Sequence, residues 1–222
     1  MTGPAMKAMR DTSGGQNSGS WLLLCAIGVL SFVLGALLGL LIVPGAREVF
    51  FPTPASEQTA DVGGPFAMVD HRGQAVSERD FRGRFLLMTF SYTHSPDIGP
   101  AQLQVMGEVM NRLGPQGQAV VPIFVTLDPE RDGPAELRAY LARFHPQFVG
   151  LTGTQEQVGA MARSWHVPFD KRPVQGGAGA YEIDHPALIY LMGRDGTYIA
   201  HFGPGTSTEA MTRQIGSLIS KQ

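Results

Sequence analysis

The sequence predicts an α/β domain in which a mixed sheet carries helices on both faces, preceded by one transmembrane helix. The 23 residues at 21–43 include no charged side chain, and about 20 apolar residues span the hydrocarbon core of a bilayer. Two shorter apolar runs, FLLMTFS at 85–91 and AVVPIFVTL at 119–127, are typical of strands that are buried on both faces. Amphipathic segments with helical spacing alternate with these strands, which favours an α/β arrangement.

The composition is that of a globular protein with an additional apolar segment. Of the 222 residues, 43% are hydrophobic and 16% are charged, and the formal net charge is -2. This balance lacks the basic excess that nucleic-acid binding needs, so we expect no nucleic-acid partner. We also expect no enzymatic activity, because neither a Ser–His–Asp order nor a pair of carboxylates stands out.

The flanks of residues 21–43 predict how this segment is placed in the membrane. Lys7 and Arg10 precede it, so the positive-inside rule leaves the N-terminus in the cytoplasm. A cleaved signal peptide is the alternative, but its apolar region is usually only about 7–15 residues long, and the PGA at 44–46 is a weak cleavage site. We therefore predict a single-pass protein of a bacterial inner membrane, held there by this one helix, with its C-terminal domain in the periplasm.

The chain divides into four parts. Residues 1–20 are interpreted as a disordered cytoplasmic tail and residues 21–43 as the transmembrane anchor. Residues 44–64 are rich in Pro, Gly and small polar residues, which is typical of a linker. Residues 65–222 remain as one domain, and this length is normal for a single hydrophobic core.

Within that domain the expected elements follow the order βαβα(α)ββα. A short hairpin through the turn HRGQ begins with the strand FAMVD at 66–70. The first helix is expected from about Ala101, where apolar residues recur with helical spacing. Asp132 and Pro134 mark the start of another helix, because proline suits the first helical turn.

Capping and turn signals organise the C-terminal part of the domain. Thr154 with Gln157 forms a capping box for one helix, and Thr206 with Glu209 forms a second box for the last helix. Between them, the turn RDGT at 194–197 joins two apolar strands in a hairpin.

This order of elements resembles a thioredoxin-like domain, and three segments resemble one family in particular. FSYTHSPDIGP at 90–100 is similar to the loop FGYTHCPDICP of the Sco/SenC family, the copper-handling assembly factors of cytochrome c oxidase. TLDPERDGPAELRAYLARFHPQFVGLTGT at 126–154 and DHPALIYLMGRDG at 184–196 resemble two further segments of that family. The resemblance implies a thioredoxin-like Sco domain at 65–222 and a role in copper-centre maturation. It also implies that the partner is a cytochrome oxidase subunit or another copper-assembly factor.

The chain departs from the family at its metal site. In the family, two cysteines of the loop and a later histidine bind copper, and these positions correspond here to Ser95, Gly99 and His185. Copper(I) is a soft ion that selects thiolate and thioether ligands, whereas a serine hydroxyl is hard and stays protonated. Cys25, the only cysteine, lies in the predicted membrane span, so the domain cannot carry out thiol–disulfide exchange.

Other side chains of this region offer replacement ligands. His94, Asp97 and His185 would supply two imidazoles and a carboxylate, a set that suits copper(II), or zinc with a bound water. The alternative is structural. Asp97 would then accept backbone N–H groups at the following helix start, and His185 would be a packing or hydrogen-bonding residue.

Two functions remain open on the sequence. The first is a Sco-like oxidase assembly factor with a degenerate copper site that binds copper through replaced ligands, and the two histidines favour it. The second is a metal-free interaction module that docks onto an oxidase subunit or another assembly factor, and the missing thiols favour it.

Overall fold

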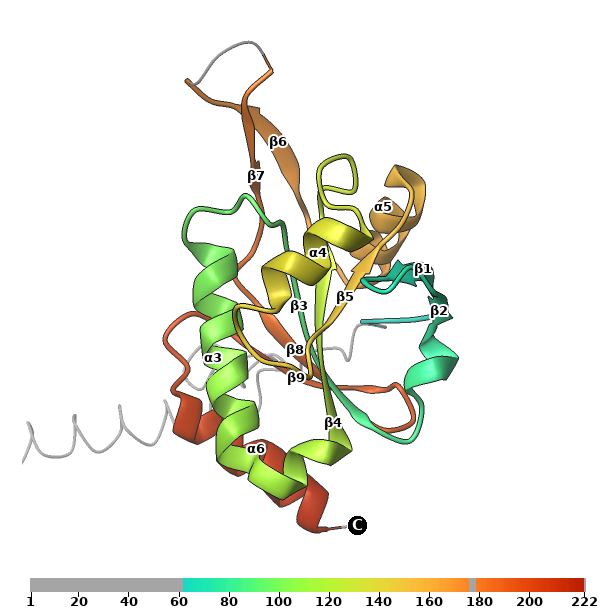
Figure 1. Cartoon of the computed structure of the whole chain (residues 1–222). Coiled ribbons are helices and arrows are strands. Elements are labelled where there is room, and N and C mark those ends of the chain that lie inside the picture. Colours follow the sequence, from blue (N-terminus) through green and yellow to red (C-terminus); the bar gives the residue numbers. More distant parts are fainter. Residues whose placement is uncertain (1–61, 176–178, 222) are drawn as a thin grey trace, which may run out of the picture. The chain divides into compact units, whose positions relative to one another are not determined.

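The structure is a computed structural model, and it describes residues 62–175 and 179–221 (Figure 1). The strands are β1 (Ala67–Asp70), β2 (Ala75–Ser77), β3 (Phe85–Ser91), β4 (Val120–Thr126), β5 (Val149–Thr152), β6 (Asp170–Pro173), β7 (Tyr181–Asp184), β8 (Ile189–Met192) and β9 (Tyr198–Phe202). The α-helices are α3 (Ile98–Leu113), α4 (Pro134–Leu141), α5 (Gln155–Ser164) and α6 (Thr208–Ser220), and two 3-10 helices are η1 (Glu78–Phe81) and η2 (Gly114–Ala119). Seven strands form one sheet in the order β2-β1-β5-β4-β3-β8-β9, and β6 and β7 form a separate hairpin.

β3 and β4 form the parallel centre of this mixed sheet. Both strands are buried along their whole length, as their continuous apolar sequences predict. They pair in register from Phe85 opposite Val120 to Ser91 opposite Thr126, so Ser91 and Thr126 are neighbours at the carboxyl ends of the two strands. β8 runs antiparallel to β3, and this direction brings the segment before β8 to the same edge of the sheet.

Helices cover both faces of the sheet, which confirms the predicted layers. On one face, residues of α3, α4 and α6 share a buried apolar cluster with residues of β3, β4 and β8. On the other face, residues of α5 and η1 pack with Trp165 in a second cluster. The predicted apolar stripe of α3 lies in the first cluster and is buried at Leu103, Met106, Met110 and Leu113.

Side-chain hydrogen bonds decide where two of the helices begin. α3 begins at Ile98, earlier than predicted, because the Asp97 carboxylate accepts the Ile98 backbone N–H at 2.6 Å and caps the helix. The capping box of α5 is confirmed. Gln157 N lies 3.3 Å from Thr154 Oγ1, and Thr154 N lies 2.8 Å from Gln157 Oε1.

The starts of α4 and α6 differ in detail from the prediction. The prediction that Thr206 caps α6 is wrong, because Ser207 Oγ accepts the Ala210 N–H at 3.2 Å, whereas the Thr206 hydroxyl donates to a backbone carbonyl of the preceding turn. α4 does begin at Pro134. The Asp132 side chain takes no part in its cap, because it bonds elsewhere in the fold.

The hairpin of β6 and β7 is not predicted by the sequence pattern, and neither is β5. The two hairpin strands pair antiparallel from Asp170 opposite Asp184 to Pro173 opposite Tyr181. Figure 1 shows this hairpin projecting beyond the central sheet. Its position matters below, because it contacts the loop that follows β4.

The tail at 1–20, the anchor at 21–43 and most of the linker at 44–64 lie outside the described residues, so these predictions stay predictions. Within the described ranges, 62–175 and 179–221, none of the helices has the length and apolar character needed to cross a bilayer.

Candidate functional site

The candidate site lies at the carboxyl end of β3, where the loop 92–97 leads into α3. Ser95 and His185 are 6% and 7% exposed, and Gly99 is also buried. A fourth residue, Ser91, joins them: it is fully buried at the end of β3, and its Oγ lies 3.2 Å from His185 Nε2. The structure therefore brings together Ser95, Gly99 and His185, the three positions that the family resemblance singles out. Ser91 lies next to them.

The hydrogen bonds of His185 define the state of its ring. Burial lowers its pKa, and the Pro186 carbonyl and the charges of Asp184 and Asp97 oppose this effect more weakly, so the ring is neutral at pH 7. Nδ1 lies 3.2 Å from Pro186 O. Because a carbonyl can only accept, the ring proton must sit on Nδ1. Nε2 is then the acceptor, and it receives the hydroxyl proton of Ser91.

Ser95 and Asp97 both stabilise the first turn of α3. Ser95 Oγ accepts the Gly99 N–H at 3.1 Å, and Asp97 Oδ1 accepts the Ile98 N–H. These two N–H groups belong to the set that a helix cannot satisfy internally at its start. The bond to the helix start that the structural interpretation of Asp97 expects is present, and Ser95 makes a comparable bond.

His94 is exposed and faces a different partner. Its Nδ1 lies 3.0 Å from Thr93 Oγ1 and 3.8 Å from Asp132 Oδ1. The hydrogen-bond partners of His185 are different residues, Ser91 and Pro186. Within residues 62–175 and 179–221, no three His, Cys, Asp or Glu side chains are grouped so as to hold a metal ion. The hypothesis that His94, Asp97 and His185 act as replacement ligands stays a prediction.

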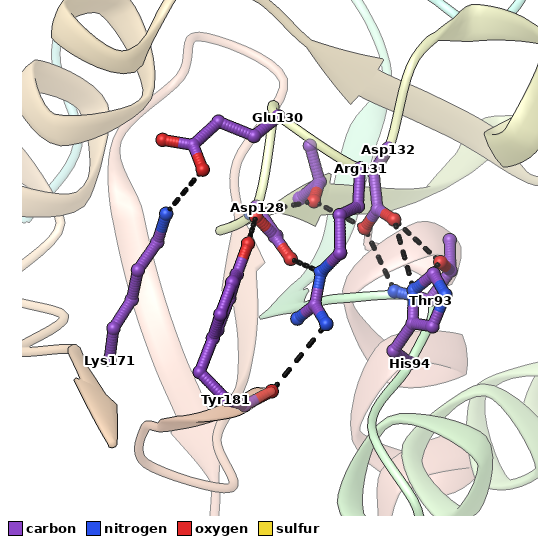
Figure 2. A network of polar contacts seen from close by, with 9 residues as sticks. Thr93, His94, Asp128, Glu130, Arg131, Asp132, Lys171 and Tyr181 are labelled. Carbon is purple, nitrogen blue, oxygen red and sulfur yellow. Dashed lines mark hydrogen bonds and ion pairs between the residues drawn. The ribbon is translucent and has the colours of Figure 1, made fainter. Parts of the chain in front are cut away.

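A buried carboxylate fixes the loop between β3 and α3. Asp132 is fully buried, and its Oδ2 accepts the Thr93 N–H at 2.8 Å and the Thr126 hydroxyl at 2.6 Å. Its Oδ1 accepts the Thr93 hydroxyl at 2.5 Å. Figure 2 shows this carboxylate facing Thr93 and His94. Asp132 thereby binds the site loop to the loop that follows β4.

A second buried carboxylate joins the β6–β7 hairpin to the same loop (Figure 2). Asp128 is fully buried and accepts Arg131 Nε–H and, at 2.9 Å, the Tyr181 hydroxyl. The Arg131 guanidinium carbon lies 3.9 Å from the centroid of the Tyr181 ring, within the range of a cation–π contact. Lys171 covers the same ring at 4.6 Å and pairs with Glu130 at 2.8 Å.

Sequence reasoning missed Ser91, Asp128 and Asp132 as site residues. In the sequence, Ser91 is only the last residue of a predicted buried strand, and Asp132 indicates a helix start. The signal that identifies them is their position, since polar residues that follow adjacent parallel strands meet at one edge of the sheet.

An apolar groove of about 550 Å³ adjoins the site. The first turns of α3, including Ile98 and Ala101, form one wall, and Ala187, Phe202 and the loop 203–206 form the other. The groove begins at Asp97 and thus continues from the site loop along the surface of the domain.

The strand order, with parallel β3, β4 and β5 flanked by antiparallel β1 and β8 and helices on both faces, defines a thioredoxin-like domain. A family model described as SCO1/SenC matches residues 54–220. The chain belongs to the SCO1/SenC family.

Individual relatives agree with this assignment. The mitochondrial SCO2 homolog of Mus musculus is 38% identical over 165 residues, which are 73% of this chain and 64% of that protein. Protein sco1 of Schizosaccharomyces pombe is 38% identical over 160 residues, 70% of this chain and 60% of that protein. The chain thus spans less than two thirds of the length of these two relatives.

Solved structures of the family have the same fold. The copper-bound structure of Bradyrhizobium japonicum ScoI is 36% identical, with a TM-score of 0.66 over 70% of this chain and 98% of that one. The copper-bound structure of yeast Sco1 is 32% identical, with a TM-score of 0.67 over 72% of this chain and 90% of that one.

The residues of this site do not fit a cuprous ion. Positions 95 and 99, which the resemblance matches to the two cysteines of the family loop, carry a hydroxymethyl group and a hydrogen atom, and the Ser95 hydroxyl accepts the Gly99 N–H at the start of α3. The Nε2 lone pair of His185 is taken by Ser91. Cuprous ion selects thiolate or thioether sulfur, and the side chains of Ser91, Ser95 and His185 offer none.

Proposed function

We propose that this chain is a membrane-anchored Sco-type protein that serves in the maturation of a respiratory cytochrome c oxidase. It acts by contacting an oxidase subunit or another copper-assembly factor, and it does not carry cuprous ion itself. The observation that carries the proposal is that the chain belongs to the family while its residues 65–222 contain no cysteine. Membership in the family supports a role in oxidase maturation, and two similar solved structures, those of Bradyrhizobium japonicum ScoI and yeast Sco1, are copper-bound.

The proposed location follows from the sequence. Residues 21–43 form a single transmembrane helix in the inner membrane, with residues 1–20 in the cytoplasm and the Sco domain in the periplasm. The length of the uncharged segment and the basic residues before it support this topology.

The apolar groove beside the site supports a binding role. Its wall on α3 includes Ala101, which is exposed, so the groove is open to a protein partner. Gln104, three residues along the same helix, is also exposed but does not line the groove. These two residues allow the groove itself to be tested against the exposed helix surface beside it.

Complementation of a strain that lacks this chain tests the proposal. Loss of the chain is expected to reduce cytochrome c oxidase activity in membranes, and the wild-type chain is expected to restore it. Ala101→Arg, which places a charge in the groove, is expected to fail, because burying an unpaired charge against a partner is unfavourable. The matched control Gln104→Arg is expected to restore activity. Unchanged oxidase activity in the deletion strain would contradict the proposal.

The replaced-ligand function is tested in the same strain. A chain with His94→Ala and His185→Gln is expected to restore oxidase activity if the chain acts by contact alone. Failure of this double variant, at wild-type protein level, would favour the alternative in which the two histidines hold copper.

A further inference from the structure

The backbone does not require glycine at position 99. Gly99 is in the first turn of α3, and its φ is not among the positive values found at eight other glycines of the described residues. Glycine is favoured here because neighbouring side chains leave no room for a Cβ. A Cβ at this position would lie 2.7 Å from Ser91 Oγ and 3.1 Å from Ser95 Cβ, and the first distance is shorter than van der Waals contact allows.

Ser91 is not free to make room. Its side chain is fully buried at the end of β3, and its hydroxyl donates to His185 Nε2. Rotation of Oγ away from position 99 would break this bond and leave a buried donor and a buried acceptor to find new partners. Ser95 is also buried, but its Cβ would lie 3.1 Å from the added Cβ, so a shift of a few tenths of an ångström would relieve that contact.

The two positions also differ together from the family loop. Aligned with FGYTHCPDICP, the segment FSYTHSPDIGP has serine where the family loop has glycine and glycine where it has the second cysteine. In this chain the serine stands at position 91 and the glycine at position 99, and a Cβ added at position 99 would lie 2.7 Å from Ser91 Oγ.

We propose that Ser91 is the residue that closes this site to a metal ion. Its hydroxyl fills the space that a ligand side chain at position 99 needs, and it occupies the lone pair of His185 Nε2. Loss of the two cysteines is therefore only part of the change, and restoring them is not enough to restore a cuprous site. This inference concerns the site alone and holds whichever partner the chain contacts.

Copper titration of the purified full-length chain tests the inference. All variants carry Cys25→Ser, so that the only thiols are those introduced. The S95C/G99C variant is compared with S91A/S95C/G99C and with S91G/S95C/G99C. Cuprous binding is measured anaerobically by competition with a chromophoric copper(I) chelator, and circular dichroism verifies that each variant is folded.

Both triple variants are expected to bind one cuprous ion about 10- to 100-fold more tightly than S95C/G99C, because the double variant must first displace the buried hydroxyl. Equal affinity of the double and triple variants would overturn the inference. Absence of binding in all three would overturn it as well, since removal of Ser91 would then not open the site.

A second measurement needs no introduced thiol. In Ser91→Ala, the Nε2 of His185 loses its donor, so its ¹⁵N chemical shift is expected to move away from the wild-type value. An unchanged Nε2 resonance in this variant would show that Ser91 does not occupy the lone pair, and it would overturn the inference independently of copper.

Discussion

Replacement of Asp132 by alanine is expected to lower the free energy of unfolding by about 3–4 kcal/mol, because three buried or half-buried donors lose their acceptor. The donors are the Thr93 N–H, the Thr93 hydroxyl and the Thr126 hydroxyl, all within 2.8 Å of the carboxylate. Two of them belong to the site loop, so the loop is expected to lose its fixed conformation together with the stability. Urea unfolding of the purified chain measures the effect.

Asp132→Asn is the matched control for this prediction. The amide keeps the shape of the side chain and one acceptor oxygen, and a threonine hydroxyl can rotate to accept from its NH₂ group. A smaller loss of about 1–2 kcal/mol is expected. A loss below about 1 kcal/mol for Asp132→Ala would mean that the loop does not depend on this carboxylate.

The second large effect is expected for Arg131→Ala. Asp128 is fully buried, and this change removes its cationic partner and the guanidinium that stacks on Tyr181. Breaking a fully buried ion pair costs about 3–5 kcal/mol, and because the Arg131 side chain is 28% exposed we expect a smaller loss of about 2–3 kcal/mol. The amides of the β6–β7 hairpin are expected to exchange hydrogen faster, since Tyr181 is the link between the hairpin and the loop after β4.

Lys171→Ala provides the comparison for Arg131. Lys171 also lies over the Tyr181 ring, but its ionic partner Glu130 is 60% exposed, and an exposed ion pair contributes only about 0–1 kcal/mol. If Lys171→Ala destabilises the chain as much as Arg131→Ala does, then packing over Tyr181 and not the buried charge pair holds the hairpin.

The central elements of the fold follow from the sequence because their signals are local. β3 and β4 are continuous apolar runs, and the box of Thr154 and Gln157 places the start of α5. The hairpin has no such signal. β6 and β7, with the sequences DKRP and YEID, show neither an apolar run nor regular alternation, and the hairpin is joined to the loop after β4 by contacts between residues far apart in sequence.

The site is predictable only in part for a similar reason. The family resemblance identifies Ser95, Gly99 and His185, and the structure does bring them together. Ser91 carries no signal of its own, because its importance depends on two long-range facts: β8 runs antiparallel to β3, and α3 begins within one side-chain length of the end of β3. The sequence around Asp132 indicates only a helix start, and it is the parallel pairing of β3 with β4 that brings this residue to Thr93.

Titration of the wild-type chain with cuprous ion, anaerobically and against a chelator of known affinity, tests the central claim most directly. The claim is that hydroxyl and imidazole groups, already hydrogen-bonded to one another, cannot replace two thiolates as ligands of a soft ion. No stoichiometric complex is expected. A tight complex of one cuprous ion per chain that persists in Cys25→Ser, and so draws on the Sco domain alone, would contradict it.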